Sequence, residues 1–250
     1  MLRTGPCAAA MALVIVVSLA LLALFHTAPF PSAFDGAVGD RAIWRMPPNP
    51  AGPTIYLTFD DGPNPTATPA LLDALAEQKA KATFFLIEPY VTDETAPLVK
   101  RMFDEGHGVA LHSDDRWLMA HTPGTIASRL TTFAARVEQL TGRRPCRAFR
   151  PHAGWRSVAM FEALGRLDYV LVGWGWMAWD WNWFRTRTAG SIERRIADRA
   201  SDGTIVVIHD GHHRDAQADR RYAVEATTML IPALRARGFS FGSVCDGRWD

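Results

Sequence analysis

Short apolar runs alternate with longer segments of helical character along the chain from residue 54 onward. The short runs are rich in β-branched and aromatic residues, which favour strands. We predict seven strands, at 54–57, 82–87, 108–112, 146–150, 169–174, 204–208 and 239–241. The intervening segments carry helix-start signals such as Thr68-Pro69 and Thr122-Pro123, and a helix-stop signal at Gly142. They predict helices at 70–80, 93–105, 123–140, 157–164, 190–200 and 218–237.

This alternation of strands and helices predicts an α/β fold in which a parallel sheet has its helices outside it. The predicted strands are nearly continuous apolar runs, which fits burial on both faces of the sheet. Seven or eight such units can close into a barrel, and an open doubly wound sheet is the alternative. In either architecture we expect functional side chains at the carboxyl ends of the strands.

An uncharged apolar run covers residues 8–25 and follows a short N-terminus, 1–7, that contains Arg3. Its length is close to the ~20 residues that span a bilayer, and no clean cleavage site follows it. We therefore expect an uncleaved transmembrane anchor, with the rest of the chain outside the cytoplasm; a cleaved signal peptide and a secreted protein are the alternative. Residues 26–52 are rich in Pro and Gly and predict a linker with little regular structure, followed by one folded domain at 53–250.

The composition indicates a folded domain with a large core and argues against one class of partner. The chain is 48% hydrophobic, enough to fill a large core, and its formal charge of +1 with dispersed Arg residues argues against a nucleic-acid partner. Of three cysteines, Cys146 and Cys245 lie in the outer region, where an oxidising compartment permits a disulfide. We predict that they pair. Two free thiols are the alternative, because the sequence does not supply the geometry.

Two adjacent carboxylates, Asp60 and Asp61, stand where the first predicted strand ends, before the turn Gly62-Pro63. Neighbouring acids repel unless a cation or a proton separates their roles. We infer that one is a metal ligand and the other a general base, with an ordinary polar turn as the alternative. Further polar residues end or follow later strands: His112, Arg150, Asp180 and His209. Polar clusters at so many successive strand ends indicate one shared site.

These segments resemble the motifs of the polysaccharide deacetylases, the carbohydrate esterase family 4 group that shares the NodB homology domain. The run Thr58-Phe59-Asp60-Asp61-Gly62-Pro63 matches the first motif in full, and the likeness extends over 53–241. The resemblance implies a distorted (β/α)7-type barrel with a divalent metal, usually zinc, at its mouth. It also implies a hydrolase that removes N-acetyl or O-acetyl groups from an amino-sugar polymer of the cell envelope.

The resemblance assigns a role to each strand-end residue. Asp61 and His112 would bind the metal, which suits zinc. Asp60 would take a proton from the attacking water. Arg150 would pair with Asp60 and hold it ionised and aimed. The backbone N–H near Ala153 would help to bind the oxyanion.

The last two motifs imply a general acid and a sugar-binding surface. His209 would protonate the departing amine, with Asp180 supporting its charged form. Trp155 and Trp181 would bind the substrate, because aromatic faces stack on sugar rings. His212 and His213 follow the acid on a polar loop and are expected to be solvated.

One position departs from the family pattern. The second motif has a second metal-binding His four residues after the first, and here that position is Arg116, whose guanidinium cannot coordinate a metal. We expect His152, which replaces a Pro of the third motif, to complete the ligand set, with Asp114, Asp115 and His121 as weaker candidates. Alternatively, Arg116 supplies positive charge in place of part of the metal's role, or the chain is a catalytically inactive glycan-binding member. Hydrolysis of a non-sugar amide is a further option.

Overall fold

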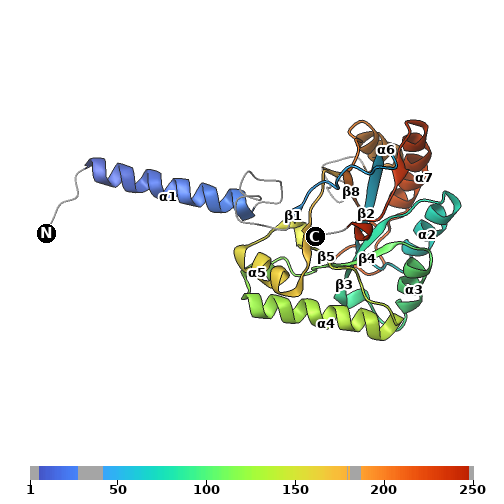
Figure 1. Ribbon diagram of the computed structural model, residues 1–250, viewed down its shortest axis with the longest axis horizontal. Coiled ribbons are helices and arrows are strands. Elements are labelled where there is room, and N and C mark those ends of the chain that lie inside the picture. Colours follow the sequence, from blue (N-terminus) through green and yellow to red (C-terminus); the bar gives the residue numbers. More distant parts are fainter. Residues whose placement is uncertain (1–5, 28–41, 179, 181–186, 248–250) are drawn as a thin grey trace.

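The computed structural model describes residues 6–27, 42–178, 180 and 187–247, and all structural statements below concern these residues. A parallel sheet forms the centre of the domain and helices pack around its outside (Figure 1). The strands are β1 (Ala42–Ile43), β2 (Thr54–Gly62), β3 (Thr83–Ile87), β4 (Gly108–His112), β5 (Ala148–Arg150), β6 (Val170–Val172), β7 (Trp176–Met177), β8 (Ile205–His209) and β9 (Ser240–Phe241). The α-helices are α1 (Pro6–Thr27), α2 (Thr68–Glu77), α3 (Ala96–Asp104), α4 (Pro123–Thr141), α5 (Val158–Leu167), α6 (Ala189–Ala197) and α7 (Arg221–Ala236). Four 3-10 helices are η1 (Glu88–Tyr90), η2 (Leu118–Ala120), η3 (His152–Gly154) and η4 (Val244–Asp246).

The helix boundaries follow the local capping chemistry. The Thr122 side chain accepts a hydrogen bond from the backbone N–H of Thr125 at the start of α4, and Gly142, with φ of 76°, ends that helix. The predicted cap at Thr68 is wrong. Thr68 is already the first residue of α2, and its hydroxyl donates to the buried carboxylate of Asp210 instead.

The strands follow the order β1-β6-β5-β4-β3-β2-β8-β7, and all of these pairs are parallel. Beyond β1 the chain crosses to the start of β8, where Arg45 and Thr204 form an isolated antiparallel bridge. The sheet is therefore an incompletely closed barrel. The strand expected last in the barrel, β9, instead pairs with the start of β2, and the expected linker 26–52 contributes β1 to the sheet.

Alternate side chains of the strands face two separate apolar cores. On β2, Ile55, Leu57 and Phe59 belong to the larger core between sheet and helices, whereas Tyr56 belongs to a smaller core inside the barrel. Because side chains alternate along a strand, Asp60 shares the inner side with Tyr56. The inner side thus changes from apolar to polar towards the carboxyl ends of the strands.

Cys146 and Cys245 form a disulfide across a sequence separation of 99 residues. Cys146 precedes β5, and Cys245 lies in η4, close to the start of β4. A Cβ atom added to Gly108 would lie 2.6 Å from the sulfur of Cys245, so a larger residue does not fit there. The disulfide fixes the C-terminal segment at the amino ends of the strands, opposite the edge where the polar residues gather.

Helix α1 lies apart from the α/β layers (Figure 1). The side chains of residues 10–21 in this helix are exposed, and they include several large apolar ones, such as Met11, Leu13 and Leu19. Counting only residues whose placement is described, no helix combines the length and the apolar character needed to cross a membrane.

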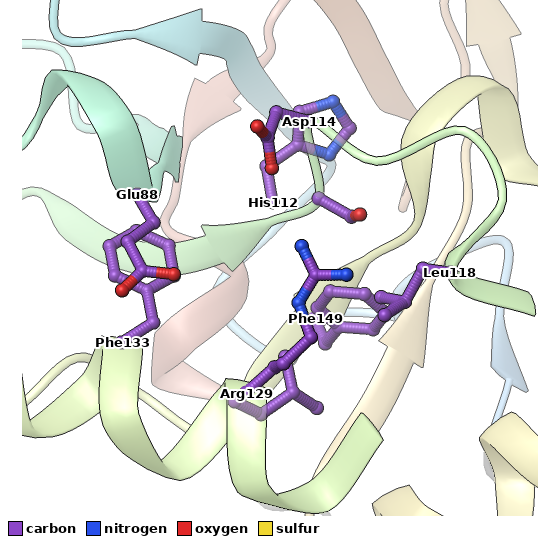
Figure 2. A pocket seen from close by; sticks show the side chains of 9 residues that line it. Glu88, His112, Asp114, Leu118, Arg129, Phe133 and Phe149 are labelled. Atoms are coloured by element: carbon purple, nitrogen blue, oxygen red, sulfur yellow. The ribbon is translucent and has the colours of Figure 1, made fainter. Parts of the chain in front are cut away.

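A small cavity of about 20 Å³ lies between the end of β4 and helix α4. His112 and Asp114 line it from the strand side, and Figure 2 shows the side chains of Arg129, Leu118 and Phe149 facing the same space. This volume is close to that of one or two water molecules. The loop that follows β4 and helix α4 therefore lie on either side of this cavity.

Candidate active site

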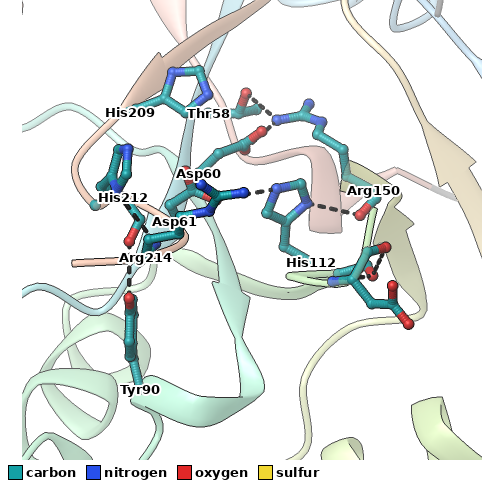
Figure 3. A network of polar contacts seen from close by, with 12 residues as sticks. Thr58, Asp60, Asp61, Tyr90, His112, Arg150, His209, His212 and Arg214 are labelled. Atoms are coloured by element: carbon teal, nitrogen blue, oxygen red, sulfur yellow. Dashed lines mark hydrogen bonds and ion pairs between the residues drawn. The ribbon is translucent and has the colours of Figure 1, made fainter. Parts of the chain in front are cut away.

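Strand register brings the strand-end residues to one edge of the barrel. Asp60 on β2 pairs with His209 on β8, and His112 on β4 pairs with Arg150 on β5. The carboxyl ends of parallel strands meet at the same edge, so the four side chains converge (Figure 3). The residues that the sequence predicted at separate strand ends therefore form a single site.

Asp60 forms a buried ion pair with Arg150, in which Nη1 of Arg150 lies 2.6 Å from Oδ1 of Asp60. The same guanidinium donates to the hydroxyl of Thr58 (2.8 Å) and to the carbonyl of Gly173 (2.9 Å), and it stacks on the Phe85 ring at 4.0 Å. These contacts fix the plane of the guanidinium. Asp60 is thereby held in one orientation with its charge balanced.

Asp61 occupies a left-handed backbone conformation, with φ of 70°, at a register shift between β2 and β3. Neighbouring strand residues normally point to opposite faces, and this irregularity is what lets Asp61 reach the same mouth as Asp60. A Cβ atom on Gly211 would lie 1.9 Å from the carbonyl oxygen of Asp61, so the loop after β8 can pack here only with glycine. Burial raises the pKa of Asp61, but the nearby imidazole of His112, at 3.4 Å, and the charge of His209 outweigh this effect, and the pKa lies well below its usual value.

Asp61, His112 and His152 form a cluster in which one ligand atom from each residue lies within 4.8 Å of the others. Oδ1 of Asp61 lies 3.4 Å from Nε2 of His112, which is close to the edge of a tetrahedral site whose ligand distances are ~2.1 Å. The rings of His112 and His152 are nearly parallel, with centroids 6.2 Å apart. His152, expected from the sequence to complete the ligand set, is thus brought together with the other two.

The chemistry of these atoms fits a divalent metal ion. Nδ1 of His112 donates to the carbonyl of Arg150 at 2.7 Å, so Nε2 is the ring nitrogen that faces Asp61 and is available to a metal. Oδ1 of Asp61 and Nδ1 of His152 are both buried and have no hydrogen-bond partner within the described parts of the chain. Burial and the charge of His112 lower the pKa of His152 to about 4, so this imidazole is neutral near pH 7. One oxygen and two imidazoles form a set typical of zinc.

Arg116 is exposed on the loop after β4, and its charge is one of the factors that lower the pKa of His152. The weaker ligand candidates lie on the same loop but outside the cluster. Asp115 instead pairs with Arg129 at 2.5 Å and with His121 at 3.5 Å. Asp114 lines the small cavity.

Half-buried His209 and fully buried Asp180 form a second pair on the opposite side of Asp60. Nδ1 of His209 lies 2.9 Å from Oδ1 of Asp180, and the backbone N–H of His209 donates to the other carboxylate oxygen at 2.7 Å. Burial lowers the pKa of His209, but Asp180, with Asp61 and Asp60, raises it to about 9. His209 is therefore an imidazolium near pH 7, with Nε2 free to donate a proton.

The expected substrate-binding residues are described in part. Ala153 lies in η3 in a left-handed conformation, with φ of 52°, and is exposed beside His152. Trp155 follows η3 and is half-buried. Trp181 lies outside the described residues.

Sequence reasoning gave no role in the site to two of its neighbours, His213 and Asp210. His213, expected to be solvated, contacts His152 edge-on with ring centroids 4.7 Å apart, and its buried Nε2 has no hydrogen-bond partner among the described residues. Asp210 is buried behind the turn at Gly62, where burial raises its pKa to about 7. Its carboxylate would lie 2.8 Å from a Cβ on Gly62. The sequence showed the turn at Gly62-Pro63 and the apolar strand before Asp210. Only the fold shows that Asp210 packs against this turn.

The barrel-like sheet brings together an ion-paired carboxylate, a cluster of possible metal ligands and a charged histidine. This combination is typical of a hydrolase that activates water. The model of the polysaccharide deacetylase family matches residues 48–172. The chain belongs to this family, as the resemblance of its motifs indicated.

Individual relatives agree with this assignment. The chain is 30% identical to a peptidoglycan N-acetylglucosamine deacetylase of Bacillus cereus over 203 residues, 81% of this chain and 91% of the relative. It is 33% identical to a chitooligosaccharide deacetylase of Sinorhizobium fredii over 204 residues, 77% of this chain and 90% of the relative. Among solved structures, a family 4 acetyl xylan esterase from Clostridium thermocellum in complex with a cobalt ion superposes with a TM-score of 0.68 at 30% identity, covering 77% of this chain and 89% of that one.

Proposed function

We propose that this chain is a metal-dependent deacetylase that hydrolyses the N-acetyl groups of an amino-sugar polymer of the cell envelope. One observation carries the proposal: the ion-paired carboxylate of Asp60 lies between the Asp61–His112–His152 cluster and the charged His209. This arrangement provides a base, a metal site and an acid around one reacting centre. The relatives act on peptidoglycan and chitooligosaccharides, both acetylated amino-sugar polymers.

We propose that Asp61, His112 and His152 hold the metal, with zinc the expected ion for this ligand set. When bound, a divalent metal lowers the pKa of a water molecule and polarises the acetyl carbonyl. The buried, unpartnered atoms of Asp61 and His152 support this assignment. Arg116 then takes no part in coordination, since His152 supplies the ligand that the second motif lacks.

Asp60 acts as the general base and accepts a proton from the attacking water. Arg150 balances its charge and keeps the carboxylate aimed through its own contacts with the inner wall of the barrel. The water oxygen forms a bond to the acetyl carbon, and the backbone N–H near Ala153 contributes to binding the oxyanion. Trp155 and Trp181 contact the sugar.

His209 acts as the general acid. Its raised pKa of about 9 keeps it protonated at neutral pH, and Asp180 holds the imidazolium in place through Nδ1. As the carbon–nitrogen bond breaks, Nε2 donates its proton to the leaving nitrogen. The products are acetate and a free amino sugar.

We propose that residues 8–25 anchor the chain in a membrane, with the catalytic domain outside the cytoplasm. The uncharged apolar run of residues 8–25 in the sequence supports the proposal, and it is longer than the stretch of α1 whose side chains are described, residues 10–21. The disulfide between Cys146 and Cys245 is also typical of a protein in an oxidising compartment. Fractionation of cells that carry the full chain tests it: recovery in the soluble cytoplasmic fraction contradicts both the anchor and the export.

The activity is tested by acetate release from N-acetylglucosamine oligomers, with and without a chelator. We expect release that a chelator abolishes and added zinc restores, and a loss of about 10²–10⁴-fold in Asp60→Asn. Metal analysis of the purified protein checks the site independently of turnover. Folded, metal-loaded protein that releases no acetate from any acetylated glycan contradicts the proposal. Glycan binding that persists in that protein after metal removal identifies the inactive, glycan-binding alternative.

A further inference from the structure

Trp117 is the most exposed large hydrophobic side chain among the described residues, at 69%. It lies on the loop between β4 and α4, one residue after Arg116. An indole left in water carries a large apolar area that is not used in folding. An exposed aromatic ring can stack on a ligand with a flat apolar face.

The backbone that presents Trp117 is held in place on both sides. Its N–H donates to Oδ1 of Asp115 at 2.8 Å, and the other oxygen of Asp115 accepts from Arg129 of α4 at 2.5 Å. The next residue, Leu118, is buried and lines the small cavity together with His112 (Figure 2). The indole is therefore exposed on a fixed loop, so little conformational freedom is lost when a ligand covers it.

This loop belongs to the rim of the proposed active site. It begins at His112, a member of the metal cluster, and five residues of chain reach at most ~18 Å. Helix η2, which follows Trp117 directly, packs against α5, and α5 follows the η3 turn that carries His152. Trp117 therefore lies on the loop that supplies His112, and it directly precedes η2, which packs against the helix that follows the His152 turn.

We propose that the indole face of Trp117 is a binding platform for a pyranose ring of the polymer, in a subsite next to the sugar that is deacetylated. The apolar C–H face of a pyranose stacks on an aromatic ring, while its hydroxyls stay in water. The inference rests on the proposed function, because it takes the acetylated amino-sugar polymer as the ligand. It makes Trp117 a determinant of chain-length preference.

Binding in the absence of turnover tests the proposal. Titration calorimetry of the full chain carrying Asp60→Asn, with the N-acetylglucosamine tetramer, measures affinity without hydrolysis. We expect Trp117→Ala to weaken tetramer binding about tenfold and Trp117→Tyr to keep most of the affinity, because a ring remains for stacking. Met229→Ala, which removes another exposed apolar side chain (48%) on the outer helix α7, is the matched control and should bind normally.

Tetramer binding by Trp117→Ala within twofold of the parent overturns the inference, as does a parent protein that binds no tetramer. If tetramer binding depends on Trp117 but the wild type releases no acetate, the proposed function fails and the platform stands. Should Trp117→Ala fail to fold, 5-fluorotryptophan labelling decides, with the Trp117 resonance assigned by its loss in Trp117→Tyr. A shift of that resonance on adding tetramer supports the platform, and an unchanged resonance overturns it.

Discussion

Replacing Asp180 with Asn removes the charge that keeps His209 protonated. The partial burial of His209 lowers its pKa, and Asp180 is the largest of the factors that raise it, to about 9. With the carboxylate gone, we expect the pKa of His209 to fall towards its ordinary value of 6.5. The variant keeps the shape of the side chain, so the change acts on charge.

The size of the effect follows from these two pKa values. A shift from about 9 to 6.5 corresponds to ~3 kcal/mol. At pH 8 the protonated fraction of His209 falls from roughly 90% to roughly 3%, so acetate release should drop about 30-fold if His209 is the acid. At pH 6 both proteins carry mostly imidazolium, and the deficit should nearly vanish.

Acetate release across pH 5–10 and NMR titration of the His209 imidazole measure the two consequences separately. A loss of orientation would lower activity by the same factor at every pH, whereas the expected pKa change moves the alkaline limb of the profile. An alkaline limb that stays near pH 9 in Asp180→Asn refutes the reasoning. His209→Gln is the control, because it should have no such limb.

The same pair makes stability depend on pH. Because the pKa of His209 is raised in the folded state, its contribution is fully present below pH 6.5 and is lost as pH rises through about 9. The wild type should therefore lose up to ~3 kcal/mol of unfolding free energy over that range relative to Asp180→Asn. Chemical denaturation at pH 6 and pH 9.5 measures the difference.

Three further variants test the site and the fold. Arg150→Gln leaves the buried carboxylate of Asp60 without its partner and should cost about 3–5 kcal/mol in denaturant unfolding; a loss below ~1 kcal/mol would contradict the buried pair. His152→Ala should weaken zinc binding at least ~100-fold in competition with a chromophoric chelator, whereas His121→Ala, on the loop outside the cluster, should not; equal affinities exclude His152 as a ligand. Cys245→Ser opens a loop of 99 residues and should lower the unfolding free energy by about 4.7 kcal/mol, and an unchanged midpoint would show that the disulfide is dispensable.

The long apolar strands were predictable because each is a run of β-branched or aromatic residues bounded by turn signals, as at 54–57 and 204–208. Two-residue strands such as β1 and β7 leave no periodic pattern and exist only through pairing with neighbours. The strand predicted at 239–241 is present as β9, but the sequence did not show that it pairs with the start of β2. Local pattern thus predicted the elements, and tertiary contacts decided the closure.

The part of the candidate site that lies at the carboxyl ends of the strands was predictable from the sequence. Asp60 and His209 lie on neighbouring strands, so the rule for parallel sheets was sufficient to bring them together. The contact between His152 and His213 joins two loops and has no counterpart in local sequence. Nor could the sequence show that Asp115 ties its loop to Arg129 rather than joining the metal cluster.

The bridge between Arg45 and Thr204 bears on how the domain can be shortened for experiments. A protein that starts at residue 53, the boundary that motif matching suggests, would lose β1 and this bridge, leaving one edge of β6 and the residue before β8, Thr204, without these partners. Bare edges of this kind recruit strands from other molecules and promote aggregation. A soluble version should therefore begin upstream of Ala42, so that it keeps both β1 and the bridge between Arg45 and Thr204.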